Sequence, residues 1–93
     1  MKATHIDQAT KLTDLPNIGP AMARDLERLG IHAPRDLEGR DPRALYDELC
    51  RLTGVRHDPC VLDVFTAAID FAGGAPATAW WAYTPRRKAG PSL

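Results

Sequence analysis

The stretch Leu15-Pro16-Asn17-Ile18-Gly19-Pro20-Ala21-Met22-Ala23 constrains the fold more than any other part of this 93-residue chain. Its first proline ends any helix before it, because the ring clashes with the preceding turn. Asn17 and Gly19 both tolerate a left-handed backbone, and Pro20 is preset for the first position of a helix. The stretch therefore predicts a tight turn between two helices, with Ile18 packed between them.

Such a turn leaves backbone N–H groups without partners at the start of the second helix. The first N–H groups of a helix have no intrahelical acceptor, and together they attract an anion such as phosphate. We expect the contacts to come from the turn and the first helical residues, namely Asn17, Ile18, Gly19, Ala21 and Met22. The cations that would add charge are Lys11, Arg24, Arg28, Arg86, Arg87 and Lys88. Since backbone amides carry no base code, nucleic-acid binding of this kind would be independent of sequence.

The sequence Leu-Pro-Asn-Ile-Gly-Pro-Ala-Met-Ala resembles the hairpin of helix-hairpin-helix proteins, whose usual pattern is Leu-Pro-Gly-Ile-Gly-Pro. The resemblance implies that the hairpin amides bind one DNA backbone without reading bases. It also implies that the turn carbonyls can hold a monovalent cation, potassium or sodium, and it implies no other cofactor. Asn17 stands where that family prefers glycine, and its side chain is expected to crowd a bound phosphate.

Glycines, and prolines that follow aspartates, divide the rest of the chain into helices. Apolar spacing and these signals predict helices over residues 8–15, 20–29, 42–52 and 59–72, with a short helical turn at 35–38. Leu45, Leu49 and Leu52 form one apolar stripe. The 59–72 helix is apolar on most sides, so we expect it to be central, with Asp63 and Asp70 on a solvated polar stripe. The predicted class is all-α, with about five short helices.

The turn at residues 54–57 repeats the pattern of a glycine followed by a β-branched residue. We therefore predict two helix-hairpin-helix units joined by a connector helix, the second unit degenerate because it lacks a Gly-x-Gly core. These units would form a domain over 1–74, followed by an aromatic and basic tail over 75–93 that packs partly back. Its rings, from Trp80, Trp81 and Tyr83, can either stack on unpaired bases or seal the core.

Cys50, His57 and Cys60 form a different candidate site. The two cysteines lie symmetrically about the second turn, so an antiparallel hairpin would bring them together. Cys60 is in the first turn of a helix, where the dipole favours a thiolate. A redox pair or part of a zinc site is one interpretation, and two small buried apolar residues at a helix contact is the other.

Charge and composition narrow the class of protein. The 12 basic and 12 acidic residues balance, and all the acids lie in residues 1–78, whereas the last fifteen residues are basic. No apolar run is long enough to span a membrane, and two cysteines without a signal peptide indicate a cytoplasmic protein. No nucleophile with a base, carboxylate pair or phosphate loop with lysine is present, so we do not expect an enzyme.

Most of the chain resembles a family of small bacterial helix-hairpin-helix proteins called pathogenicity-locus or mitomycin-resistance proteins. The residues that carry the resemblance lie in four segments, 15–30, 45–50, 58–65 and 80–81. Resistance to a DNA cross-linker is compatible with a DNA-associated role. The sequence thus favours sequence-independent nucleic-acid binding. A protein-interaction module that uses the hairpins and the tryptophan tail is the alternative, and the cysteine site is the third.

Overall fold

The computed structural model describes residues 2–89, apart from the side chains of residues 86 and 89. The α-helices are α1 (Pro20–Arg28), α2 (Pro42–Thr53), α3 (Cys60–Ala72) and α4 (Thr84–Ala89). The 3-10 helices are η1 (Ile6–Gln8), η2 (Leu12–Asp14), η3 (Pro34–Leu37) and η4 (Trp80–Tyr83). No strand occurs among the described residues, and the predicted all-α class is confirmed. None of the helices described is long and apolar enough to cross a membrane.

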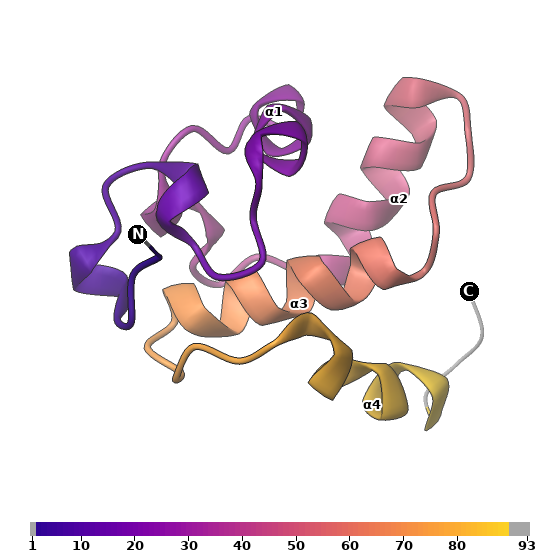
Figure 1. Ribbon diagram of the computed structural model, residues 1–93. Coiled ribbons are helices and arrows are strands. Elements are labelled where there is room, and N and C mark those ends of the chain that lie inside the picture. The colour runs from indigo at the N-terminus through magenta and orange to yellow at the C-terminus, as the bar shows by residue number, and fades with distance from the viewer. Residues whose placement is uncertain (1, 90–93) are drawn as a thin grey trace.

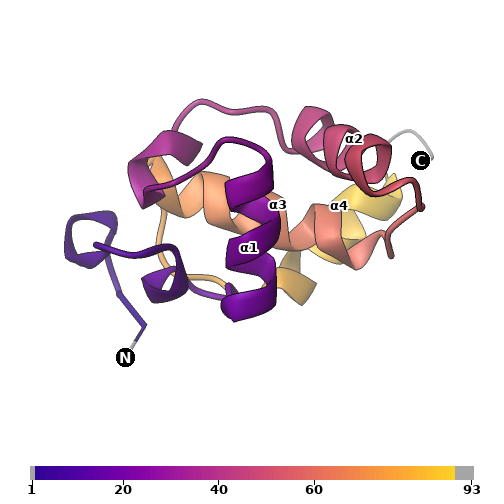
Figure 2. The same ribbon diagram turned by 90° about the horizontal axis from the view of Figure 1, so that it is seen from above.

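The helix α3 lies at the centre of the molecule, as its apolar composition predicts. It runs between α1 and α2 on one side and the C-terminal tail on the other (Figure 1). Seen from above, α1 crosses over α3, and α2 lies beside its N-terminal half (Figure 2). Phe65 and Phe71 of α3 are fully buried, together with Leu26 of α1 and Leu49 of α2. One core therefore joins all three helices.

The start and stop signals of the helices act as predicted. The Asp41 carboxylate accepts a hydrogen bond from the Arg43 N–H at 3.0 Å, which caps α2, and Asp58 does the same for the Cys60 N–H of α3 at 2.8 Å. Gly54 ends α2 with a left-handed backbone at φ 72°. These signals are local, so the sequence alone specifies them.

The predicted helix over residues 8–15 is wrong, since two separate 3-10 turns, η1 and η2, take its place. The cause is Asp14, whose carboxylate accepts hydrogen bonds from the N–H groups of Thr10 at 3.0 Å and Lys11 at 2.9 Å. These bonds cap a new turn at Lys11 and interrupt any helix that would run through it. They also hold the pKa of the Asp14 carboxyl below its usual value.

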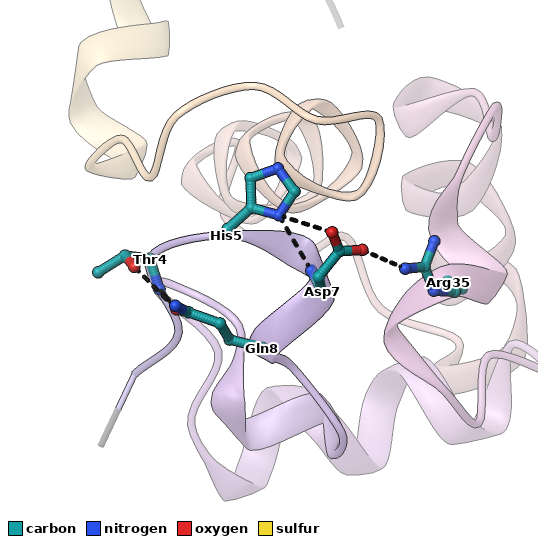
Figure 3. Close-up of polar contacts among 5 residues, drawn as sticks. All are labelled: Thr4, His5, Asp7, Gln8 and Arg35. Carbon is teal, nitrogen blue, oxygen red and sulfur yellow. Dashed lines mark hydrogen bonds and ion pairs between the residues drawn. The ribbon is translucent and has the colours of Figure 1, made fainter.

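The N-terminal segment is tied to the rest of the molecule. Ala3 and Ile6 are buried, and the Ala3 N–H donates to the Asp14 carbonyl at 2.8 Å. Figure 3 shows the polar contacts that follow: Thr4 bonds to Gln8 across η1, and Asp7 lies between His5 and Arg35 of η3. The segment therefore lies against both η2 and η3.

For two helical residues, the predicted exposure to solvent is wrong. Asp63, expected on a solvated stripe, is only 1% exposed. Its carboxylate accepts from the Thr84 hydroxyl at 2.7 Å and from the Arg87 guanidinium at 2.9 Å, so it ties α4 to α3. Leu52, expected in the apolar stripe of α2, is 47% exposed because it lies in the last turn of α2, past the core contact.

Candidate nucleic-acid interface

The turn at residues 15–19 ends at the first residue of α1. Leu15 and Ile18 are fully buried, and the Ile18 N–H donates to the Leu15 carbonyl at 3.2 Å. Asn17 takes the left-handed backbone at φ 70°, as its residue type allows. Gly19, also expected to suit a left-handed turn, is instead extended at φ −94°, ψ −179°, because it serves as the residue before Pro20 and as the N-cap of α1.

The start of α1 presents open N–H groups to solvent. Gly19 caps the helix without a side chain, and its carbonyl accepts from the Ala23 N–H at 2.9 Å. No described residue accepts a hydrogen bond from the N–H of Gly19, Ala21 or Met22. Gly19 and Ala21 are exposed and Met22 is half-buried. A Cβ added at Gly19 would meet no atom within 4 Å apart from its chain neighbours, so there is room for a side chain at this position.

The Asn17 side chain is held by a contact with the C-terminal part of the chain. Its amide nitrogen donates to the Thr78 carbonyl in the linker before the tail, at 2.8 Å. This contact joins the turn to residues far along the chain and holds the asparagine side chain in place.

Three of the cations expected near the turn lie on exposed positions. Arg24 and Lys11 form no ion pair with any described residue, whereas Arg28 pairs weakly with Asp25 at 3.4 Å. Lys11 also lines an open hollow of about 290 Å³ between η2 and α1, with Glu27 on the opposite wall. Two cations without an ion pair among the described residues thus lie at the start of η2 (Lys11) and on α1 (Arg24).

The tail cations are placed differently from one another. Arg87 is only 18% exposed at its side chain and is paired with buried Asp63, so it holds the tail against α3. Lys88 is exposed. The expected contribution of Arg86 lies outside the described side chains.

The tail aromatics differ in how far they are buried. Trp80 packs against the core, as the sealing interpretation predicts, and Tyr83 is half-buried. Trp81 is 64% exposed and meets Trp80 edge-to-face, with ring centroids 5.7 Å apart. One ring of the pair therefore seals α3, while its neighbour faces solvent.

Lys2 is a residue of this region that the sequence did not single out. Its ammonium donates to the Thr13 carbonyl at 2.6 Å and to the Ile18 carbonyl. These are carbonyls of the turn region, where the helix-hairpin-helix resemblance implies a potassium or sodium ion. Because a lysine ammonium already lies on them, the residues present do not fit a metal cation.

For Cys50, His57 and Cys60 the sequence allows either a redox or zinc site or small residues at a helix contact. Among residues 2–89, no three His, Cys, Asp or Glu side chains lie close enough to hold an ion. Both thiols are free, and the His57 N–H donates to the Cys50 sulfur at 3.4 Å. A hydrogen bond to Asp58, followed by burial, raises the pKa of the Cys60 thiol, which is opposite in direction to the effect expected from the helix dipole.

The second turn is closed by Tyr46, which sequence reasoning did not single out. Its hydroxyl donates to the His57 carbonyl, and the His57 ring lies 2.9 Å from the Thr53 hydroxyl. Burial, together with the neighbouring Cys50, raises the pKa of the Tyr46 phenol. This cluster holds α2 against the loop that leads to α3, which is a structural role.

Residues 5–89 match the family model described as Cdd1, pathogenicity locus. The chain belongs to this family, as its sequence resemblance predicts. It is 48% identical over 77 residues to the mitomycin resistance protein McrB of Streptomyces lavendulae, a match that covers 83% of this chain and 73% of that protein. No solved structure matches the chain.

Proposed function

We propose that residues 12–28 act as a helix-hairpin-helix motif whose first helix is reduced to η2, and that this motif binds the DNA backbone. The open N–H groups of Gly19, Ala21 and Met22 would hold one phosphate at the start of α1. The binding would be non-enzymatic and independent of base sequence, because main-chain donors contact phosphate rather than base edges.

The observation that carries the proposal is the set of open amides at a rigid helix start. Three N–H groups without acceptors are exposed or half-buried, and nothing covers Gly19. The turn behind them is held by buried Ile18 and by the Asn17–Thr78 bond, so the donors are preorganised for an anion. Arg24 on α1 and Lys11 at the start of η2 would add positive charge to this part of the molecule.

The relative from Streptomyces also supports a role in DNA binding. It is named for resistance to mitomycin, a compound that cross-links DNA, and a protein that associates with DNA is compatible with such a role. One hairpin offers few phosphate contacts, so the affinity of a single copy should be modest and strongly reduced by salt.

The test is a fluorescence-anisotropy titration with two labelled duplexes of unrelated sequence and the corresponding single strands, over a series of salt concentrations. We expect equal affinity for both duplexes, with log Kd rising linearly with log salt concentration. The variant Gly19→Glu should lose at least tenfold in affinity, because a carboxylate would replace the phosphate at the open amides. Arg24→Ala should weaken binding and reduce the salt slope by about 1.

The matched control is Ala44→Glu, which adds the same charge at an exposed position of α2. Both variants should fold, since Gly19 has an ordinary backbone and open space around it, and Ala44 is on the helix surface. Affinity that is unchanged by salt, or lost equally in both glutamate variants, would contradict the proposed site.

A second candidate is a protein-docking role for the tail, favoured by the exposure of Trp81. Large exposed aromatic residues are typical of interaction surfaces. In this case a partner captured by the wild type would be lost with Trp81→Ala while DNA affinity would be unchanged. If Trp81→Ala weakens binding to single strands instead, the ring stacks on bases.

A further inference from the structure

Two carbonyl oxygens of the turn region converge on one cation. The Lys2 ammonium donates to the Thr13 carbonyl at 2.6 Å and also to the Ile18 carbonyl, sixteen residues away from Lys2 in the sequence. Neither oxygen accepts a hydrogen bond from any other described residue. The ammonium therefore uses two of its three donors on groups that would otherwise lack a partner in the protein.

The position of Lys2 is set by the residue that follows it. Ala3 is 7% exposed and its N–H donates to the Asp14 carbonyl at 2.8 Å. Farther along, Asp7 bonds to Arg35 and Thr4 to Gln8, which secures the segment at its other end (Figure 3). The lysine side chain thus extends from an anchored backbone toward the turn.

We infer that Lys2 is a tethered cation that takes the place of a metal ion in the turn, so that the native protein orders its 15–19 turn without potassium or sodium. An alkylammonium and a potassium ion both carry one positive charge and both bind carbonyl oxygens. Because Lys2 is part of the chain, its local concentration at the turn far exceeds that of a free ion. Removal of the ammonium should uncover a carbonyl site that a monovalent metal ion can enter.

This inference concerns the turn itself and does not depend on DNA binding. It assigns Lys2 a positioning role, since the Ile18 carbonyl belongs to the residue just before Gly19. A cation on that carbonyl holds the peptide plane whose N–H is the first of the open amides.

The experiment measures thermal unfolding of the full chain by circular dichroism in potassium chloride and in tetramethylammonium chloride at equal ionic strength. Tetramethylammonium is too large, and has no N–H groups, to replace the ammonium. The wild type should have the same Tm in both salts. Lys2→Met should have a Tm about 4–8 °C lower in tetramethylammonium chloride and should regain most of this loss in potassium chloride, with saturation.

The control is Arg56→Met, which removes one exposed positive charge from the second turn. Its Tm should be the same in both salts. As a direct measurement, the amide signals of Ile18 and Gly19 in Lys2→Met should shift as potassium is added, and those of the wild type should not.

Three results would overturn the inference. The first is a wild-type Tm that depends on which cation is present. The second is a Lys2→Met protein that is as stable as the wild type in tetramethylammonium chloride. The third is a Lys2→Met protein that is destabilised or unfolded to the same extent in both salts, which would mean that potassium cannot replace the ammonium.

Discussion

The pair formed by Asp63 and Arg87 gives the sharpest stability prediction. Asp63 is 1% exposed and Arg87 is 18% exposed at its side chain, and the guanidinium lies 2.9 Å from the carboxylate. Arg87→Met keeps the apolar stem but leaves a buried carboxylate that retains only the Thr84 hydroxyl. Loss of one partner of a buried pair costs about 3–5 kcal/mol, and the remaining hydroxyl lowers this to about 2–3 kcal/mol.

The assay is urea unfolding followed by circular dichroism. With a slope of about 1–3 kcal/mol per molar urea, Arg87→Met should lower the midpoint by about 0.7–3 M. The double variant Asp63→Leu with Arg87→Met should recover most of this loss, because no unpaired charge stays buried. Arg51→Met, which breaks an exposed pair with Glu48, is the control and should leave the midpoint unchanged. A single variant Arg87→Met as stable as the wild type would refute the structural role of this pair.

Three further predictions concern the turn, the carboxylate caps and Cys60. Asn17→Ala should destabilise the protein by about 1–2 kcal/mol, since alanine disfavours φ 70°, and Asn17→Gly should lose less in the same urea assay, because only the bond to Thr78 is removed. The Tm should fall as pH drops from about 4 to 2. Capping carboxylates whose pKa is lowered by folding stabilise the protein above their unfolded pKa, and this stabilisation is lost as pH falls through their folded pKa. These carboxylates are Asp14, Asp36 and Asp58. At pH 8 Cys60 should react with iodoacetamide more slowly than a cysteine in an unfolded peptide, because its thiol has a raised pKa, and equal rates would contradict this.

Features set by neighbouring residues could be predicted from the sequence. The carboxylate caps at Asp41 and Asp58 act within two residues of themselves. The left-handed stops at Gly30 and Gly54 follow from local backbone freedom. The central position of α3 follows from its composition alone. In each case the physical cause and the sequence signal lie in the same short segment.

Features that depend on distant contacts could not be predicted. Lys2 meets the Ile18 carbonyl across 16 positions, Asp63 meets Arg87 across 24, and Asn17 meets Thr78 across 61. Nothing in the local pattern around Asp63 separates a buried, paired carboxylate from a solvated one. Sequence reasoning therefore located the turn, but it missed the lysine that contacts the turn and the pairing of Arg87 with Asp63.

The shape of the first helix shows a conflict between two local signals. Apolar spacing favours a helix over residues 8–15, while Thr10 and Asp14 favour a capped turn. The capped turn prevails because the Asp14 carboxylate satisfies two backbone N–H groups and the Thr10 hydroxyl at once. The sequence signal for this capped turn is an aspartate that follows a threonine by four residues, since its carboxylate can bond to backbone N–H groups three and four residues earlier.

The most direct measurement of the central claim is a ¹H–¹⁵N NMR titration of the chain with a short DNA duplex at low salt, repeated with a duplex of unrelated sequence. We expect the largest shifts at the amides of Gly19, Ala21 and Met22, in the same pattern for both duplexes, and we expect them to reverse when salt is added. Shifts confined to other residues, or a pattern that changes with the DNA sequence, would contradict binding of the backbone by these amides.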